Sequence, residues 1–510
     1  MKAVQHSFCY RWQEEKDAMI CRDLACEPES GFSHIVENHV IGLYPSCTFQ
    51  TVEGFGCAMT ETSCSLLAGL PAEQRREALS LWFGPEEGKA RFIRIPIDSC
   101  DYALSEYQAV PDPISDPELK TFSISRDQKY MIPVVKEALA LCGGKLSVLM
   151  SPWSPPWQWK TPPLDRENDA AVYGGQKAVR EGKPSRCNGG SLKPEYYASW
   201  AAYLIKYLQA YLAEGIPVTM LSVQNEAAAA TPWDSCVWTG EEERIFVKDF
   251  LFPALKAAGL AEQVGLFIWD HNKERMVENI EEIMDEETAP MIAGFAYHWY
   301  TGDHFEALSL VKGKYPDKIL MHSESCPLHK PGKAGSADMD LEALRKKPRA
   351  ALSADELAVL EGDAGKTPAE MDAEDALAYA HDMIGDLNHG MERWIDWNMI
   401  VDMEGGPRHV PGGFAAPLLL DGKDGVIRTR AYECLRLIMD TIPAGSVRIG
   451  SSSYAQKEEA VAVRLPDGEI RVLILHPTAK EETVFLRLDG RVITVSLPAD
   501  SLTAVSVRRS

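Results

Sequence analysis

The sequence predicts an α/β protein: a (β/α)₈ TIM barrel with a side β-sandwich formed by the N- and C-terminal segments. Short apolar runs alternate with helical patterns through the middle of the 510-residue chain, which is typical of parallel βα units. Eight such runs can be counted, and eight strands close this kind of barrel. From about residue 447, short alternating strands separated by turn signals take over, which indicates an all-β module.

The eight candidate strands are apolar runs of the kind that a parallel sheet buries on both faces. They lie near Gly54–Ala58, Phe92–Ile97, Leu146–Met150, Thr219–Gln224, Gly265–Trp269, Ala293–Trp299, Lys318–Ser323 and Arg393–Met399. The clearest helix precedes the fourth run, where aromatic and leucine side chains recur at helical spacing on one face. Those side chains are Tyr197, Trp200, Leu204, Tyr207 and Tyr211.

Three segments follow from this pattern. Residues 1–50 lack helical periodicity and are expected to supply strands to the sandwich, because the C-terminal strands alone are too few to enclose a core. Residues 51–440 form the barrel, and residues 441–510 form the rest of the sandwich. Insertions near 160–186 and 327–372 follow strand ends on the face where barrel enzymes build their sites. They are either surface additions or walls beside a cleft, the second of which another subunit could complete.

Composition excludes several classes of function. The chain has 52 basic and 75 acidic residues, a net charge of −23, which disfavours nucleic acid and anionic membranes. The first residues lack the apolar core of a signal peptide, and no long apolar run could span a bilayer. The 12 cysteines form no CxxC pair. We therefore expect a cytoplasmic protein without membrane insertion, metal or cofactor.

Two glutamates stand where apolar strands end. Glu226 closes the fourth run in LSVQNE, and Glu324 closes the seventh in ILMHSE. Strands four and seven lie on opposite sides of a barrel, so their carboxylates can face each other across a bound sugar. A retaining glycosidase needs two carboxyl groups about 5–5.5 Å apart. Asn225 supplies an amide at the same rim, and a raised pKa of Glu226 is expected beside an ionised Glu324.

Aromatic and polar residues gather at the same strand ends. Sugars stack their C–H faces on indole rings, and this chain carries tryptophans at or just beyond most strand ends, among them Trp153 and Trp397. Arg94 lies inside FIRIPI, where an unpaired charge would be costly, so a carboxylate such as Glu324 should pair with it. Asp101 could hold sugar hydroxyls. The remaining polar candidates are Asp270, His271 and His298.

Ten short strings carry a resemblance to a known family. They are, in order, GFGCAMTET, RIPIDSCDY, SPWSPPWQWK, NGGSLKPEYY, VQNE, TPWDSCVWT, IWDHN, YHWY, HSES and WIDWNMIVDMEGGP. In these strings and their order the chain resembles glycoside hydrolase family 30, which includes glucosylceramidases, β-glucosidases, β-xylosidases and β-1,6-glucanases. The resemblance implies a retaining mechanism with Glu226 as acid/base and Glu324 as nucleophile. It also implies sugar-binding roles for Asp101, Trp153, Asn225, Trp299, Tyr300 and Trp397.

The chain departs from the family pattern beside the implied site. Ala227 follows the acid/base glutamate where relatives often have proline, and RHVPGGFAAP replaces an asparagine-containing loop. The insertion after strand seven is longer than expected. These departures concern the leaving-group side of the site. The missing signal peptide argues against lysosomal or secreted work on sphingolipids.

The expected substrate is a β-linked glycoside or oligosaccharide, with a β-glucoside first and a β-xyloside, β-fucoside or β-1,6-glucan as the alternative. Exo or endo action and a homo-oligomer stay open. Two other classes remain. One is a catalytically inactive sugar-binding barrel, although both glutamates are present. The other is a metal-dependent hydrolase using His271, His298 and His322, although no HxH pair occurs.

Overall fold

A computed structural model gives the fold. It describes residues 1–510 except 13–17, 30–38, 86–88, 162–186, 232, 328, 330–365, 411–412, 423–424, 455–456 and 509–510. Almost all of the insertion predicted near 160–186, and most of that near 327–372, therefore lie outside the described residues. The segment boundaries predicted after residues 50 and 440 remain predictions.

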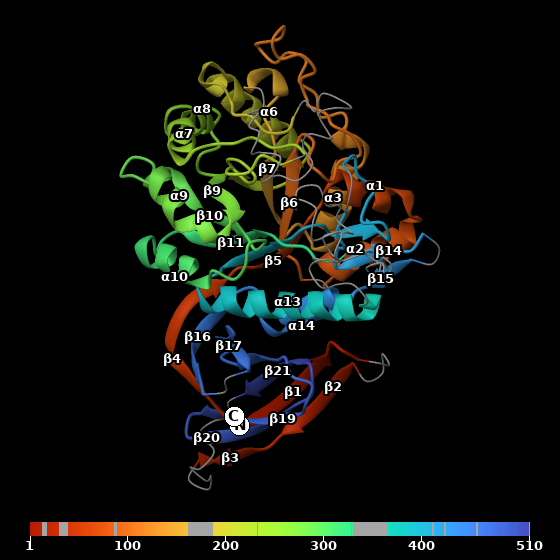
Figure 1. The fold of residues 1–510 in the computed structure, drawn as a ribbon, viewed down its shortest axis with the longest axis vertical. Helices are drawn as coiled ribbons and strands as arrows, with labels where there is room; N and C mark the ends of the chain where they lie inside the picture. The colour runs from red at the N-terminus through yellow and green to blue at the C-terminus, as the bar shows by residue number, and fades with distance from the viewer. Residues whose placement is uncertain are drawn as a thin grey trace, which may run out of the picture.

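Eight parallel strands close a barrel in the order β10-β11-β12-β5-β6-β7-β8-β9 (Figure 1). Their bounds are Gly54–Ala58 (β5), Phe92–Ile97 (β6), Ser147–Pro152 (β7), Val218–Ser222 (β8), Gly265–Asn272 (β9), Ile292–His298 (β10), Ile319–Glu324 (β11) and Arg393–Asp396 (β12). Each coincides with one of the eight apolar runs, so the barrel prediction is confirmed.

Helices alternate with these strands and cover the outside of the barrel. They are Glu61–Gly69 (α1), Ala72–Phe83 (α2), Met131–Leu141 (α3), Tyr197–Ala213 (α6), Gly240–Phe246 (α7), Phe252–Ala257 (α8), Met276–Ile283 (α9), Phe305–Lys314 (α10), Pro368–Asn388 (α13) and Arg430–Thr441 (α14). The aromatic face predicted before the fourth strand is the buried face of α6. Thr367 and Glu370 form a capping box that fixes the start of α13.

Inside the barrel, side chains form an apolar layer and then a polar one. The apolar layer is a cluster of Phe92, Leu149, Met220, Phe267, Ala296, Met321 and Ile395. Because side chains alternate along a strand, the residue two positions further on points to the same interior. On five strands that residue is polar: Arg94, Ser151, Ser222, His298 and Ser323. The barrel thus fills its middle with hydrocarbon and its C-terminal end with hydrogen-bonding groups.

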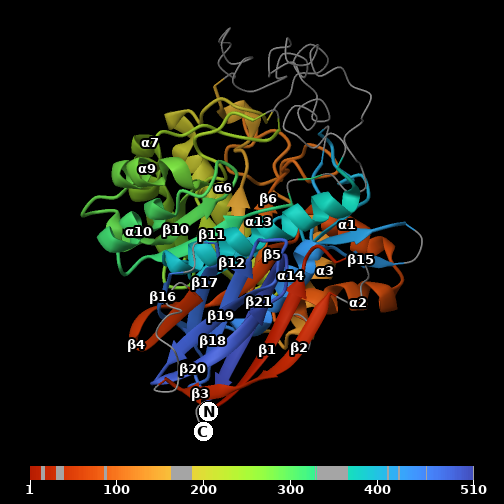
Figure 2. The same cartoon turned by 60° about the horizontal axis from the view of Figure 1, so that its bottom comes forward.

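The two chain ends build one ten-stranded sheet in the order β2-β1-β21-β18-β17-β16-β4-β19-β20-β3 (Figure 2). Its strands are Lys2–Cys9 (β1), Met19–Leu24 (β2), Cys26–Pro28 (β3), Val40–Val52 (β4), Ser446–Ser453 (β16), Glu459–Arg464 (β17), Ile470–His476 (β18), Glu482–Leu488 (β19), Arg491–Leu497 (β20) and Ser501–Arg508 (β21). The long strand β4 pairs with β16 on one side and β19 on the other, so it joins the two halves of the sandwich. The expectation that residues from both ends share this module is confirmed. A small separate sheet is formed by Ile400–Asp402 (β13), Leu418–Leu420 (β14) and Val426–Arg428 (β15).

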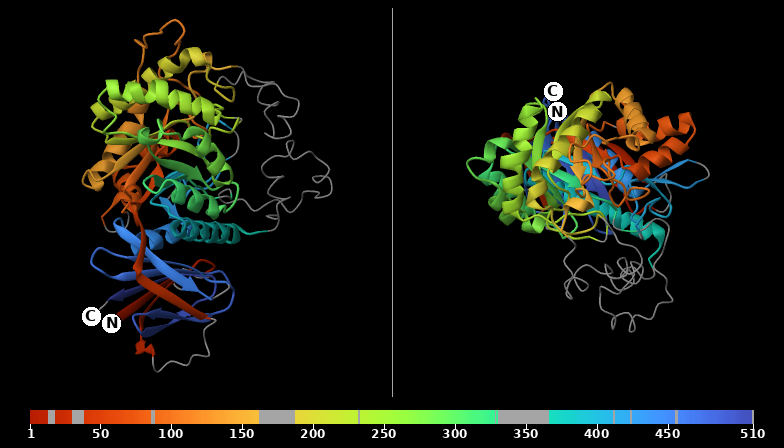
Figure 3. Two further views of the ribbon diagram at one scale, coloured as in Figure 1. Left: turned by 90° about the vertical axis from the view of Figure 1, so that its left-hand side faces the viewer. Right: turned by 90° about the horizontal axis from the view of Figure 1, so that it is seen from above.

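Helices α13 and α14 lie across the boundary between barrel and sandwich, and both chain termini lie at the sandwich's outer end (Figures 1 and 3). Strand β18 is buried on both faces. Val472 and Ile474 belong to the sandwich core, whereas Leu473 and Leu475 belong to the core that continues into the barrel. His381 of α13 also pairs with Glu459 of β17 at 2.7 Å. Apolar packing and an ion pair therefore connect the two modules.

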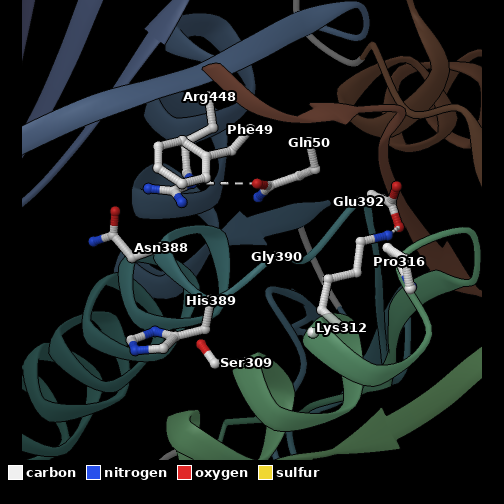
Figure 4. Close-up of a pocket in the computed structure, with 11 residues that line it drawn as sticks. Phe49, Gln50, Ser309, Lys312, Pro316, Asn388, His389, Gly390, Glu392 and Arg448 are labelled. Atoms are coloured by element: carbon white, nitrogen blue, oxygen red, sulfur yellow. Dashed lines mark hydrogen bonds and ion pairs between the residues drawn. The ribbon is translucent and has the colours of Figure 1, made fainter. Parts of the chain in front are cut away.

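A pocket of about 560 Å³ opens at this boundary (Figure 4). The guanidinium carbon of Arg448 lies 3.5 Å from the Phe49 ring centroid, and Lys312 pairs with Glu392 at 3.0 Å. Neither Glu226 nor Glu324 lines this pocket. The pocket thus belongs to the boundary between barrel and sandwich and is separate from the site at the barrel mouth.

Candidate active site

Two irregularities in the barrel aim polar groups at its C-terminal mouth. Pairing of β9 with β10 passes from Trp269 opposite Ala296 to His271 opposite Tyr297, which leaves Asp270 as an extra residue. Pairing of β10 with β11 likewise skips Ser323. Trp269 and Asp270 both adopt positive φ, at 75° and 47°. Bulges and left-handed non-glycine residues are concentrated at functional sites, where they redirect side chains.

The bulge in β9 decides which side chain enters the polar layer. Strand alternation alone would continue from Phe267 to Trp269. Trp269 instead packs in the large core outside the barrel's interior cluster and donates Nε1–H to the Asn272 carbonyl at 3.0 Å. Asp270 takes the interior position and bonds the neighbouring strands. A carboxylate therefore replaces an indole at the centre of the site.

Arg94 is fully buried and connects polar groups at the ends of three other strands. Its guanidinium donates to Glu324 Oε2 at 2.5 Å, to Asn225 Oδ1 at 2.7 Å and to Asp270 Oδ2 at 2.9 Å. Two carboxylates offset the cost of burying this cation. The pairing with Glu324 expected from the sequence is present. Because Arg94 occupies Asn225 Oδ1, the amide nitrogen of Asn225 remains available as a donor.

Asp270 accepts from every side. Ser222 and Ser323 each donate a hydroxyl to it at 2.5 Å, and His298 Nε2 lies 3.1 Å from Oδ1. Burial raises the pKa of Asp270, but Arg94, His298 and Ser222 outweigh it and hold that pKa below its usual range. Asp270 is thus an ionised anchor that fixes His298. The serines were missed by sequence reasoning, although each ends an apolar run.

Glu324 is held in place by two donors. Arg94 binds one carboxylate oxygen, and the Tyr300 hydroxyl donates to the other at 3.0 Å. Burial raises the pKa of Glu324, His298 and Arg94 oppose it, and the charge of Glu226 adds to the rise, so the pKa lies above its usual value. Two fixed hydrogen bonds leave this carboxylate with one orientation, which suits an attacking group.

Glu226 adopts a φ of 50°, and its backbone N–H donates to the Asp270 carbonyl at 2.8 Å. Its Oε1 lies 3.6 Å from Nδ1 of both His271 and His298. Burial raises the pKa of Glu226, but the two imidazoles and Arg94 lower it by more than burial raises it. The pKa of Glu226 therefore lies below its usual value. The expected rise is therefore wrong for the free protein. Sequence reasoning considered only the other glutamate and could not see the two histidines.

One imidazole reaches both glutamates. His298 Nδ1 lies 3.6 Å from Glu226, and its Nε2 lies 3.9 Å from Glu324 Oε2. Burial lowers the pKa of His298, but Glu324, Asp270 and Glu226 together raise it to about 9. The ring is thus a cation at neutral pH, placed between the two carboxylates. The sequence listed His298 as a polar candidate without indicating this position.

Aromatic rings cover the guanidinium of Arg94. Trp153 and Trp397 stack with centroids 4.9 Å apart, and Arg94 lies 4.9 Å from the Trp153 ring. Asp101 is buried nearby and lies 3.5 Å from Arg408, a residue that sequence reasoning missed. Burial raises the pKa of Asp101 to about 7 despite Arg408. Arg408 comes from the RHVPGGFAAP segment, so this departure from the family pattern contacts a predicted sugar-binding residue.

Trp299 is largely buried, as are Trp153 and Trp397. Its ring packs edge-on against Tyr379 with centroids 5.0 Å apart. Its next residue, Tyr300, points to Glu324 instead. The sugar-binding role expected for Trp299 stays a prediction.

Together these groups can perform acid–base and nucleophilic chemistry at one point. Two carboxylates, one bonded by Arg94 and Tyr300 and one facing two imidazoles, end strands on either side of the barrel mouth. Hydrogen-bond donors and a tryptophan pair surround them, as a polar, ring-shaped ligand requires. Two groups of histidine and carboxylate could also hold a metal ion: Glu226, His271 and His298, and His322, Asp382 and Asp386.

Comparison with known proteins identifies the family of this barrel. Residues 52–339 match the glycosyl hydrolase family 30 TIM-barrel domain, and residues 445–505 match the family's β-sandwich domain. The fold and the strand-end carboxylates are those of a glycoside hydrolase. The chain belongs to glycoside hydrolase family 30, as its sequence strings indicated.

Relatives span different substrates. The chain is 27% identical to the lysosomal acid glucosylceramidase of Mus musculus over 463 residues, 87% of this chain and 78% of that protein. It is 27% identical to an endo-1,6-β-D-glucanase of Neurospora crassa over 234 residues, 45% and 44% of the two chains. The crystal structure of SrfJ from Salmonella typhimurium aligns over all of both chains with a TM-score of 0.82 and 30% identity.

Proposed function

We propose that this glycoside hydrolase cleaves β-D-glucosidic bonds with retention of configuration, through a covalent glycosyl-enzyme. The observation that carries the proposal is the placement of Glu226 and Glu324 at the mouth, joined by His298 and held by Arg94. Glu324, fixed by Arg94 and Tyr300, is the nucleophile. Glu226, the more accessible of the two, is the acid/base.

In the first step Glu324 attacks the anomeric carbon while Glu226 protonates the departing oxygen, which breaks the glycosidic bond and forms a glycosyl ester. In the second step Glu226 removes a proton from water, which attacks the same carbon and releases Glu324 as a carboxylate. Two inversions at one carbon give net retention. The amide nitrogen of Asn225 and the hydroxyl of Tyr300 are the donors proposed to stabilise the charge that develops at this rim.

The glycone is proposed to rest against Trp153 and Trp397, with Asp101 as the acceptor for its hydroxyls. A β-glucoside suits this arrangement and agrees with the glucosylceramidase relatives. A β-1,6-glucan is the second candidate, because one relative is an endo-1,6-β-D-glucanase. Within the described residues no helix is long and apolar enough to cross a membrane. The cytoplasmic location remains a prediction from the N-terminus.

A panel of aryl β-glycosides and β-linked disaccharides tests both points. Release of glucose should exceed release of xylose or fucose, and the first product seen by proton NMR should be the β-anomer. An α-anomer as first product would contradict the retaining mechanism. Preferred cleavage of β-1,6-linked glucose oligomers over aryl β-glucosides would instead favour the second candidate.

A further inference from the structure

The two groups of histidine and carboxylate in the barrel differ in what fills them. One group consists of His322, Asp382 and Asp386. Within it, Lys273 Nζ lies 2.5 Å from Asp382 and 3.0 Å from Asp386. His322 has both ring nitrogens engaged, one with Asp386 at 2.7 Å and one with the Glu324 carbonyl at 2.9 Å. An ammonium group therefore already occupies the place that a metal cation would take there.

The second group, Glu226 with His271 and His298, contains no lysine or arginine side chain; its positive charge is that of the His298 ring, whose proton a metal ion would displace. Nδ1 of each histidine lies 3.6 Å from Glu226 Oε1, which is too long for a hydrogen bond. Both Nδ1 atoms are buried and have no hydrogen-bond partner among the described residues. His298 itself is fully buried. Two unsatisfied nitrogens therefore point at one carboxylate oxygen, an arrangement that is costly unless something lies between them.

The spacing suits one transition-metal ion. The three ligand atoms all lie within 4.8 Å of one another. Zinc binds imidazole nitrogen and carboxylate oxygen at about 2.0–2.2 Å, which places tetrahedral ligands roughly 3.3 Å apart. A displacement of a few tenths of an ångström would bring Glu226 Oε1 and each Nδ1 to that separation. Two histidines and one carboxylate are also a donor set that prefers zinc or copper to magnesium.

The surroundings orient the ligands and leave a way in. His298 Nε2 faces Asp270 Oδ1 at 3.1 Å, which directs Nδ1 towards Glu226, as carboxylates behind metal-bound histidines do. Glu226 and His271 keep 13% and 12% of their side chains exposed to the cleft. Because both side chains are partly exposed, solvent can reach the ligands, and water can complete the coordination of a bound ion.

We propose that Glu226, His271 and His298 form a binding site for a single Zn²⁺-class ion that reversibly inhibits the enzyme. An ion bound to Glu226 occupies the oxygen that would protonate the leaving group, so hydrolysis stops until the ion leaves. The binding stands by itself, whereas the inhibition rests on the proposed role of Glu226. The metal is an inhibitor here and has no part in the hydrolysis.

Zn²⁺ titration of the full-length protein by calorimetry tests the binding. A metal must displace protons from its ligands, so the titration is done at pH 7.5. A Cys21→Ser/Cys47→Ser background removes the two exposed thiols, which could bind zinc elsewhere. We expect one Zn²⁺ per chain, no binding of Mg²⁺, and loss of at least about tenfold in Zn²⁺ affinity in His271→Asn.

His304→Asn is the matched control, because it makes the same exchange at an exposed histidine. Its φ of 37° is a conformation that asparagine accepts. This control should bind Zn²⁺ as the parent does. Visible absorption of bound Co²⁺ gives a second readout, and its ligand-field bands should change in His271→Asn and not in the control.

Activity on an aryl β-glucoside completes the test. Zn²⁺ should inhibit with the affinity measured by calorimetry, EDTA should restore turnover, and His271→Asn should need at least about tenfold more Zn²⁺ relative to its own metal-free rate. Absence of binding, binding unchanged in His271→Asn, or binding without inhibition would each overturn the proposal. A protein inactive on every glycoside before zinc is added would defeat the proposed function instead, and calorimetry would still decide the site.

Discussion

The barrel mouth and the sandwich core bury their side chains for opposite purposes. At the mouth, Arg94, Asp270 and Glu324 are charged, buried and tied together by hydrogen bonds. In the sandwich, the enclosed residues are aliphatic, such as Ile474, Leu486 and Val505. Buried ion pairs contribute little net stability, whereas each aliphatic side chain removed from water contributes about 1.5–3 kcal/mol. The mouth is therefore built for orientation, and the sandwich adds stability at a distance from it.

The largest expected effect separates the two regions at the nucleophile. Glu324→Ala should lower turnover of an aryl β-glucoside by a factor on the order of 10⁴ or more, because the attacking carboxylate is lost. The protein should stay folded, because Arg94 keeps its ion pair with Asp270 when Glu324 is removed. Activity within tenfold of the parent would exclude Glu324 as nucleophile.

Glu226→Ala should have an effect that depends on the leaving group. Alkyl glycosides need protonation, so their hydrolysis should fall by about 10²–10⁴-fold. Formation of the glycosyl-enzyme from activated aryl glycosides should be largely spared. Azide should restore turnover, because it replaces the water that Glu226 activates. Equal losses on both substrate types without azide rescue would argue against the assignment.

Arg94→Met should lower both the stability of the protein and its catalytic rate. It leaves Asp270 and Glu324 buried without their shared cation, and breaking such a network costs about 3–5 kcal/mol. Denaturant unfolding measures the loss, and kinetics should show reduced kcat. If stability fell without any change in kcat, Arg94 would have no part in orienting Glu324.

Ile474→Ala addresses the sandwich alone. Its side chain is fully buried in the sandwich core, so truncation should cost about 2–5 kcal/mol of unfolding free energy. The kcat per folded molecule should be unchanged, because none of its core neighbours reaches the mouth. A reduced kcat in fully folded protein would show that the sandwich influences the site.

The smallest expected effect concerns the ion pair of His381 and Glu459 at the boundary between barrel and sandwich. Glu459 and Asp303 raise the pKa of His381 to about 9, mainly through the hydrogen bond that the His381 ring donates to the Glu459 carboxylate. Because the pKa of His381 is higher in the folded protein than its unfolded value near 6.5, the ion pair stabilises the folded protein fully at pH values below 6.5. This stabilisation is lost as the pH rises through about 9.

His381→Gln should therefore lower the melting temperature at pH 6 and have almost no effect at pH 10. At pH 6 the variant should lose at most about 1 kcal/mol of unfolding free energy relative to the parent, because both partners of the ion pair are roughly one third exposed. Thermal scans of parent and variant at the two pH values measure it. An equal difference at both would mean that packing, not charge, explains any effect.

The sequence by itself determined the order of strands and the positions of the two glutamates. Continuous apolar runs such as FIRIPI are typical of buried parallel strands, and in a barrel the residue after such a run is expected at the mouth. The buried charge of Arg94 also required a carboxylate partner, and the sequence limited the candidates. These are local patterns, which need no knowledge of neighbouring strands.

Only the tertiary structure decided which side chains meet. A bulge in β9 places Asp270 inside the barrel and sends Trp269 to the core, a choice that strict alternation would reverse. His298 lies between two glutamates that are 72 and 26 residues away in the chain, counting from Glu226 and to Glu324. Register shifts and long-range contacts depend on how neighbouring strands pair, and that pairing leaves no mark on the local sequence.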